Sequence, residues 1–309
     1  MASRGFLIIV LIIVLALVAA IVYGTSAGTV AVTAAAVRVP AISVAEQQLT
    51  ESIADRAARV TSLSPLRKRI TAIAGDDGQV GVYVEDLSTR AWIGVNEGKP
   101  FVARSLIKTY LLIAILQDVE DGKRSLTDQI PIMPSDRDSK SGSLFTAAND
   151  TYTLGQLLTA LIVSSDNTAA RALERQLDEG DMRSIGRLMG PGRVSHDGTA
   201  FATPRSYGRV LRGLHNGAYL SPQASQYALS LLSHTGFGNE LAGGTSTLAV
   251  AHKVGTDVDF GIHHDCGIVY AKRPYVLCVM TENLTTAQAA TVTQTIGTAA
   301  LEYFNTPSR

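Results

Sequence analysis

Ser105-Leu106-Ile107-Lys108 is the first segment of the chain whose residue types and spacing could do chemistry. Residues three apart on a helix share one face, so the Lys108 amine can lie beside the Ser105 hydroxyl. A serine hydroxyl is a poor nucleophile until a base takes its proton, and a lysine in a dry site near other cations can be that base. The pattern also fits the solvated start of an ordinary helix, so by itself it decides little.

Ser165-Asp166-Asn167 is the second such segment. Ser165 could pass a proton to a leaving group and Asn167 could hold an amide carbonyl, while Asp166 is expected to tie the loop down through backbone hydrogen bonds. The alternative is a simple helix cap, because all three residue types commonly open a helix.

Lys253-Val254-Gly255-Thr256 is the third segment, expected on a strand that is followed by a turn. A strand beside a reactive serine can bind an extended substrate by backbone pairing. The Thr256 N–H would then oppose the N–H of Ser105 as a second oxyanion donor, and Lys253 would attract a substrate carboxylate. Taken alone, Lys253 is better explained as a strand-end lysine in solvent.

The three segments in this order resemble the S-x-x-K, S-D-N and K-T-G set of class A β-lactamases and penicillin-binding proteins. The resemblance covers roughly residues 64–303, nearly the whole of the expected extracytoplasmic domain. It implies acyl transfer, with an acyl-enzyme formed on a β-lactam or a D-amino-acid peptide of the peptidoglycan type. The residues it implies are Ser105, Lys108 and Ser165 as catalytic groups, and Asn167, Lys253, Gly255 and Thr256 as substrate-binding groups.

The elements that must position these residues follow from the hydrophobic periodicity. Strands are expected at 80–84, 91–95, 248–253, 267–270 and 275–280. Helices are expected from Ser64 as N-cap to Gly75, and at 105–116, 154–162, 168–177, 204–214 and 286–303. Two strands, a helical block, three strands and a closing helix indicate a discontinuous α/β unit with an all-helical insertion. The resemblance implies an α+β sandwich: a five-stranded antiparallel sheet flanked by helices, of the β-lactamase/transpeptidase type.

The N-terminal part predicts attachment to a membrane. Residues 6–22 are all Phe, Leu, Ile, Val or Ala, and Arg4 precedes them. As a helix this run spans about 26 Å, close to the hydrocarbon thickness. We expect an anchor within 1–24 that places the rest outside the cytoplasmic membrane, although cleavage after a small-residue site at 34–36 would release it. A tether with a stalk helix is expected at 25–62, and a catalytic domain at 63–309, with its α/β part at 63–104 and 236–309 and its helical part at 105–235.

The chain departs from the family at the group that would activate water. Class A β-lactamases carry a Glu for this purpose on a loop after the second motif, whereas residues 190–203 contain no Glu. Glu174 and Glu179 fall in or just after an earlier helix and are expected to be poor substitutes. His196 or Asp197 could act as a base, but a turn at that point explains them as well or better.

Two further positions differ from the family. Val254 replaces a threonine of the third motif, a loss for which Thr256 could compensate. His263 and His264 occupy a strand where many relatives place a carboxylate-binding Arg. Adjacent strand residues point to opposite faces, so the two histidines do not form a metal cluster, and one of them could face the cleft.

Cys266 and Cys278 lie almost symmetrically about an expected turn at 271–274. If the flanking strands pair, the two thiols face each other and an oxidising compartment would permit a disulfide. The interpretation we favour is two small buried core residues.

Composition narrows the functional class. Lys plus Arg and Asp plus Glu are both 27, so the formal charge is zero and no basic stripe indicates nucleic-acid binding. No cofactor or metal is implied. Three functions remain: a penicillin-binding or D-peptide hydrolase with slow turnover, an efficient β-lactamase with an unrecognised base, and a membrane-tethered binding or sensing domain.

Overall fold

The computed structural model describes residues 63–75, 78–190, 199–245 and 247–306. The expected membrane segment, tether and stalk helix, and the turn at His196 and Asp197, lie outside these residues. Within them, no helix is both long enough and apolar enough to cross a bilayer.

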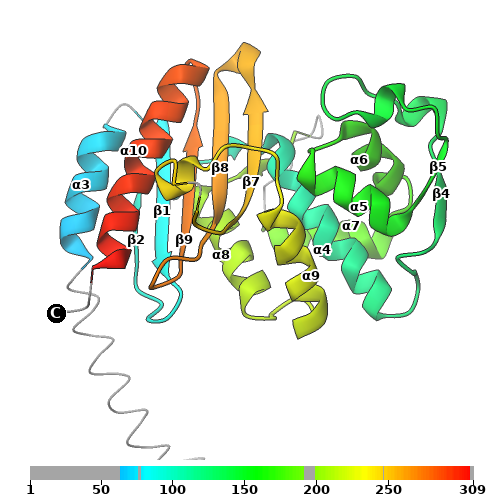
Figure 1. The fold of residues 1–309 in the computed structure, drawn as a ribbon, viewed down its shortest axis with the longest axis horizontal. Helices are drawn as coiled ribbons and strands as arrows, with labels where there is room; N and C mark the ends of the chain where they lie inside the picture. The colour runs from blue at the N-terminus through cyan, green and yellow to red at the C-terminus, as the bar shows by residue number, and fades with distance from the viewer. Residues whose placement is uncertain (1–62, 76–77, 191–198, 246, 307–309) are drawn as a thin grey trace, which may run out of the picture. The chain divides into compact units, whose positions relative to one another are not determined.

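The centre of the fold is a five-stranded antiparallel sheet (Figure 1). Its strand order is β2 (Trp92–Val95), β1 (Val80–Asp86), β9 (Tyr275–Thr281), β8 (Ile262–Val269) and β7 (Val250–Asp257). Two strands from before the helical part thus pair with three from after it, as the sequence predicted. The sheet is of the predicted antiparallel type because hairpins join β1 to β2, β7 to β8 and β8 to β9.

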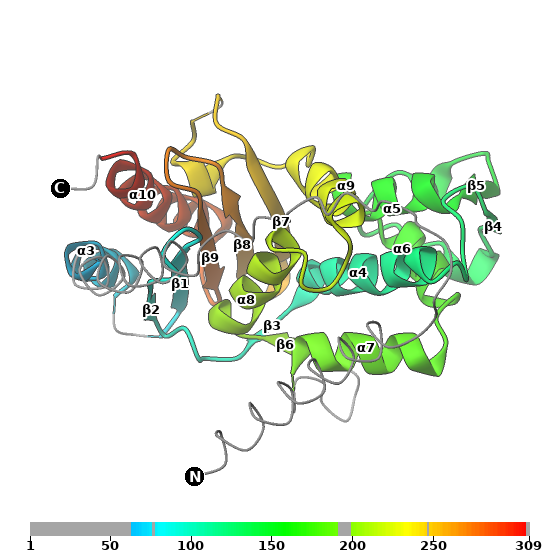
Figure 2. The same cartoon turned by 90° about the horizontal axis from the view of Figure 1, so that it is seen from below.

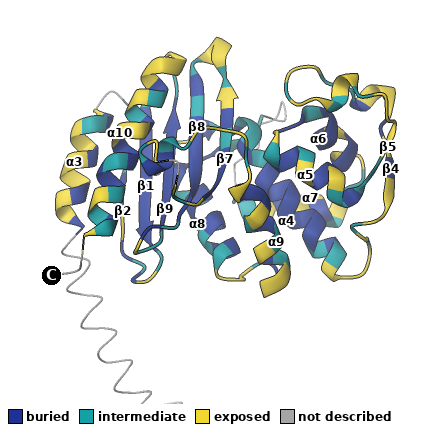
Figure 3. Cartoon of the chain, in the orientation of Figure 1, coloured by how far each residue is buried: buried dark blue, intermediate teal, exposed yellow. Residues whose placement is uncertain are grey.

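The sheet is buried on both faces. One face packs against α3 (Ser64–Ala74) and α10 (Thr286–Asn305), whose apolar side chains form one core with Val82, Leu277 and Val279. The other face packs against the helical part through the alternate strand positions. Figure 3 shows the strands as mostly dark, with exposed residues on the outer sides of α3 and α10 and at the upper ends of β7 and β8.

The helical part is built around α4 (Ile107–Glu120), which is buried at every residue from Lys108 to Leu116. The other helices are α5 (Leu154–Val163), α6 (Asn167–Glu174), α7 (Glu179–Met189), α8 (Pro204–His215) and α9 (Pro222–Ser233). Figure 2 shows α4 running from the sheet into the helical part, with α7 alongside it. Helices α7 and α9 were not predicted.

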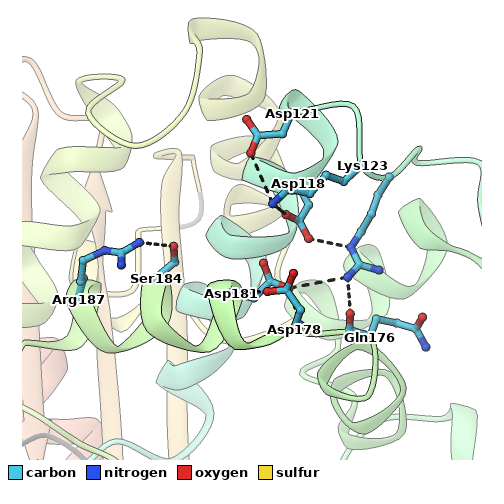
Figure 4. A network of polar contacts seen from close by, with 9 residues as sticks. Asp118, Asp121, Lys123, Gln176, Asp178, Asp181, Ser184 and Arg187 are labelled. Carbon is cyan, nitrogen blue, oxygen red and sulfur yellow. Dashed lines mark hydrogen bonds and ion pairs between the residues drawn. The ribbon is translucent and has the colours of Figure 1, made fainter.

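Polar contacts fix the far end of α4 (Figure 4). Asp118 in its last turn accepts hydrogen bonds from Lys123 Nζ at 2.7 Å and Arg124 Nε at 2.9 Å. Arg124 also donates to the carbonyl of Gln176 and lies 3.8 Å from the carboxylate of Asp181 on α7. These contacts join the C-terminal end of α4, the helix that carries Lys108, to the segment after α6 and to α7.

Several boundaries differ from the prediction. The N-cap of α3 is Leu63, with Ser64 already in the helix, while Gly75 ends the helix as predicted with φ 71°. The helix expected at Ser105 begins as a 3₁₀ turn, η1 (Arg104–Leu106), before α4. Strand β7 continues to Asp257, so the whole third motif lies within the strand.

Cys266 and Cys278 are directly opposite each other on β8 and β9 and form a disulfide, although we favoured two unbonded core residues. Both are fully buried. In the same row of the sheet, Lys253 pairs with Cys266 and Tyr83 pairs with Cys278, so these four side chains share one face.

Candidate functional site

Ser105 lies in η1, where the chain passes from the sheet to α4. The preceding residue, Arg104, has a left-handed backbone with φ 48°, which is uncommon for a residue with a side chain. Arg104 is bound to Asp257 at the end of β7, with an N–O distance of 2.7 Å. Gly255 faces the same turn, because a Cβ there would lie 2.9 Å from the Ala103 carbonyl oxygen. The turn that carries Ser105 is therefore packed directly on β7.

Lys108 is buried, so its interpretation as part of a solvated helix start is wrong. Its ammonium donates to the backbone carbonyl of Ser165, to Ser165 Oγ at 3.1 Å and to Asn167 Oδ1 at 2.7 Å. Burial lowers the pKa of Lys108 to about 8, against the opposing effect of the acidic groups Asp166, Glu174 and Asp138. With a pKa of about 8, roughly a tenth of Lys108 is neutral at pH 7, and this fraction rises as the pH approaches 8.

Ser165 is held in a left-handed backbone with φ 53° just before α6. Asp166 caps that helix by accepting from Ala169 N at 2.8 Å, and its other oxygen accepts from Leu144 N at 2.9 Å. The helix-cap interpretation is thus correct for Asp166, which also ties the loop down as expected. Its neighbours Ser165 and Asn167 are left to face Lys108.

Lys253 is fully buried, so its interpretation as a solvent-exposed strand end is also wrong. Its ammonium donates to Ser165 Oγ at 2.9 Å and to the Val254 carbonyl at 3.1 Å. Burial, together with the nearby charge of Lys108, lowers the pKa of Lys253 to about 7.

A buried polar chain precedes Lys253 on β7. His252 Nδ1 lies 2.7 Å from Asp265 Oδ1 on β8, and His252 Nε2 lies 2.7 Å from Thr235 Oγ1. Burial alone would lower the pKa of His252, but the charge and hydrogen bond of Asp265 raise it overall. No local sequence pattern indicates this pair, because its members are 13 residues apart on different strands.

These segments meet at one cleft of about 650 Å³ between β7, η1 and the helices α4 and α6. Five of the seven residues named from the sequence line it: Ser105, Lys108, Ser165, Asn167 and Thr256. The other two adjoin them, since Lys253 contacts Ser165 and Gly255 packs on the turn of Ser105. The structure therefore brings all seven predicted residues together.

Glu174 also lines the cleft, contrary to the expectation that it is poorly placed. It follows Asn167, Ala170 and Arg171 along one face of α6, and all four face the cleft. Desolvation by the surrounding protein raises the pKa of its carboxyl, against the charges of Lys108 and Arg171. Glu179, in contrast, is exposed and paired with Arg183.

Neither histidine of β8 is among the residues that line the cleft. His264 is buried, with Nε2 3.0 Å from the Val102 carbonyl and Nδ1 accepting from Thr281 N, and burial lowers its pKa to about 4. His263 Nε2 lies 3.3 Å from Thr286 Oγ1. The described residues contain no group of His, Cys, Asp or Glu side chains arranged to hold a metal ion.

Asp138 also lines the cleft, although none of the sequence motifs contains it. Its Oδ1 accepts from Asn167 Nδ2 at 3.2 Å, and its Oδ2 accepts from Arg171 Nη2 at 2.6 Å. No short-range pattern marks Asp138, because it lies in a loop 29 residues before its partner Asn167.

The meeting of a Ser-x-x-Lys turn, a Ser-Asp-Asn loop and a Lys-x-Gly strand at one cleft agrees with a family comparison. Residues 65–304 match the model of the β-lactamase enzyme family. The chain belongs to this family.

Individual relatives agree with this assignment. A β-lactamase of Streptomyces albus G is 25% identical over 249 residues, which are 71% of this chain and 78% of that protein. An ancestral class A β-lactamase has a TM-score of 0.69 and 25% identity, covering 77% of this chain and all of its own. The acyl-enzyme complex of a PBP-A mutant with penicillin G has a TM-score of 0.71 and 21% identity, covering 78% and 97%, which shows the shared fold.

Proposed function

We propose that this β-lactamase family member forms a covalent ester between Ser105 and the carbonyl carbon of a β-lactam or a D-amino-acid peptide. The observation that carries the proposal is that two buried lysines, Lys108 and Lys253, donate to one hydroxyl, Ser165, in the cleft that Ser105 lines. A site that only binds has no need of a nucleophile beside two lysines with lowered pKa values. The β-lactamase of Streptomyces albus G and the penicillin complex of PBP-A support this substrate class.

The proposed acylation moves one proton from the serine to the departing nitrogen. Neutral Lys108 takes the proton of Ser105 as the Oγ–carbon bond forms. Ser165 then gives its proton to the nitrogen as the carbon–nitrogen bond breaks, and recovers one from the Lys108 ammonium, which it contacts at 3.1 Å. The N–H groups of Ser105 and Thr256 hold the oxyanion, and Asn167 and Lys253 orient the substrate.

The test is to incubate the 63–309 domain with a fluorescent penicillin and to follow the intact mass with time, alongside Ser105→Ala. A mass increase that the mutant lacks supports the proposal. A persistent adduct favours a penicillin-binding protein with slow turnover. Rapid loss of the adduct with accumulation of ring-opened product favours a β-lactamase. No adduct with penicillins or D-alanyl peptides contradicts the proposal and favours a binding or sensing role.

Glu174 supports efficient β-lactamase turnover as the second candidate function. It is a carboxylate on the wall of the cleft that contains Ser105 and Lys108, and its raised pKa brings it closer to that of a useful general base. In this scheme Glu174 takes a proton from water as the water oxygen attacks the acyl carbon. Glu174 then passes that proton to neutral Lys108, and Lys108 gives it to Ser105 Oγ as the acyl carbon–Oγ bond breaks, so every group returns to its starting state.

A pair of matched variants tests this second candidate. Glu174→Gln should lengthen the lifetime of the acyl-enzyme about 10²-fold while the acylation rate stays similar. Glu179→Gln, five residues along the chain and on the surface, should leave the lifetime unchanged. An equal acyl-enzyme lifetime in the wild type and in Glu174→Gln would show that the Glu174 carboxylate takes no part in deacylation.

We further propose that the domain works outside the cytoplasmic membrane, anchored by residues 6–23. The apolar run at 6–22 after Arg4 supports this location. The disulfide between Cys266 and Cys278 supports it too, because such bonds persist in oxidising compartments. Fractionation of cells that express the full chain, with protease added to intact spheroplasts, tests it: the domain should stay with the membrane and be degraded from outside.

A further inference from the structure

The side-chain amide of Asn167 lies between two groups of opposite hydrogen-bonding character. Its Oδ1 accepts from the Lys108 ammonium at 2.7 Å, and its Nδ2 donates to Asp138 Oδ1 at 3.2 Å. The charged ammonium can only donate and a carboxylate can only accept. When Lys108 is neutral and can also accept, the Asp138 carboxylate alone still excludes the flipped amide. A flipped amide would oppose its NH₂ to the ammonium and its oxygen to the carboxylate, so these two neighbours permit one orientation of Asn167.

Asp138 is itself held firmly in place. Its Oδ1 also accepts from Lys140 N at 2.8 Å, its Oδ2 accepts from Arg171 at 2.6 Å, and its backbone N–H donates to Thr168 Oγ1 at 3.0 Å. Burial alone would raise its pKa, but the hydrogen bonds from Lys140 and Asn167 and the charge of Arg171 lower it overall. Asp138 is therefore a charged acceptor at neutral pH, fixed to α6 independently of Asn167.

One hydrogen of the Asn167 amide is used by Asp138, which leaves the second for a ligand in the cleft that Asn167 lines. We propose that Asp138 is a positioning residue that fixes the Asn167 amide so that this second N–H meets the carbonyl of a substrate acylamino group. The inference rests on the proposed acyl-enzyme function and extends it to the substrate class: acylamino-substituted substrates gain from Asp138, and substrates without that carbonyl do not.

The experiment compares acylation of two penicillins by intact mass: benzylpenicillin, and the penicillin nucleus that bears a free amine in place of the acylamino side chain. The quantity compared is the acylation rate with benzylpenicillin divided by the rate with the free amine. This ratio does not depend on the fraction of folded protein, so a folding defect cannot imitate the effect. Asp138→Ala should lower the ratio about tenfold, as should Asn167→Ala. Asp138→Asn keeps an oxygen for Lys140 N and Asn167 Nδ2 and should hold the ratio within about threefold of wild type.

Asp128→Ala is the matched control, because Asp128 is an exposed loop aspartate that caps a turn outside the cleft and should not change the ratio. An unchanged ratio in Asp138→Ala while Asn167→Ala lowers it overturns the inference. So does an unchanged ratio in Asn167→Ala, or an equal loss in Asp138→Asn and Asp138→Ala. Failure of the proposed function looks different, since wild type would then form no adduct with either compound.

Discussion

Lys108 and Lys253 donate to the same hydroxyl oxygen, that of Ser165, at 3.1 Å and 2.9 Å. The two lysines come from α4 and β7, elements that are separated in sequence by most of the helical part. Burial lowers the pKa of both, to about 8 and about 7. Ser165 is therefore placed to exchange protons with two amines whose charge changes near neutral pH.

The pKa of Lys108 predicts the pH dependence of acylation. If its neutral form is the base, the single-turnover rate at saturating penicillin should rise about tenfold from pH 6 to pH 7 and level off above about pH 8. At saturating penicillin, the measured rate is not lowered by any weakening of substrate binding that the titration of Lys253 causes. Quenched reactions read by intact mass give the profile, with Ser105→Ala as the blank. A flat profile from pH 6 to pH 9 would argue against Lys108 as the base.

Replacement of Lys253 by Met should stabilise the fold and slow acylation. A lysine whose pKa is lower in the folded state than in the unfolded state destabilises the fold most at low pH, and this cost disappears as pH rises towards 10.5. At pH 6 we expect a gain of about 1 kcal/mol, which raises Tm by about 2–4 °C. Thermal unfolding at pH 6 and pH 9 measures it. Lys99→Met, at a partly exposed ion pair with Glu282, is the comparison and should show no such gain.

Gly142 should not tolerate a side chain. Its φ is 89°, and a Cβ there would lie 2.0 Å from Asp166 Oδ2, the group that anchors the Ser165 loop. Gly122 has a similar φ of 72°, and a Cβ there would meet no atom within 4 Å. Gly122→Ala therefore measures the cost of the left-handed backbone alone, about 1 kcal/mol of unfolding free energy. We expect Gly142→Ala to lose at least about 1 kcal/mol more than Gly122→Ala, and acylation with it. Urea unfolding and acylation rates measure both losses, and equal behaviour of the two variants would contradict the predicted clash.

Asp265→Asn should weaken the fold in a pH-dependent way. The pKa of His252 is raised in the folded state, so the charged pair contributes fully below the unfolded value of about 6.5 and fades as pH rises through the folded pKa. The loss should be about 1–3 kcal/mol at pH 5.5 and smaller at pH 9. Urea unfolding at the two pH values gives the difference, with the exposed Asp259→Asn as control. The same loss at both values would mean that His252 is neutral in the fold.

Much of the fold could be predicted because the relevant signals are local. Alternating apolar residues marked the five strands of the central sheet, and Gly75 marked the end of α3. Helices α7 and α9 were missed, although Asp178 and Ser221 cap them and Pro222 opens the second. The strand expected at 248–253 ends too early, because β7 continues through Gly255 to Asp257. A glycine is required at position 255 because the strand packs closely against η1 there.

The site could be predicted as a set of segments but not as a network. The motifs named the residues that line the cleft, yet alone they favoured a solvent-exposed Lys253, which is buried. Asp138 and the pairing of His252 with Asp265 depend on contacts between distant parts of the chain, which periodicity does not encode. Glu174 is expected from the sequence to be a poor substitute because it falls in an earlier helix and not in the stretch at 190–203. Only the direction of α6 shows that its face lines the cleft.

The described domain begins and ends in one layer, since Arg69 of α3 is bound to Glu302 of α10 and the two helices lie side by side on the sheet (Figure 1). Neither helix contributes a residue to the cleft, which lies at the opposite, β7 edge of the sheet. A linker, a fluorescent label or a solid support joined at either end would therefore be attached behind the sheet. Under the proposed function, Ser105 would then remain accessible to large, immobile substrates such as a polymer network, and both ends of the described domain could be engineered without narrowing the cleft.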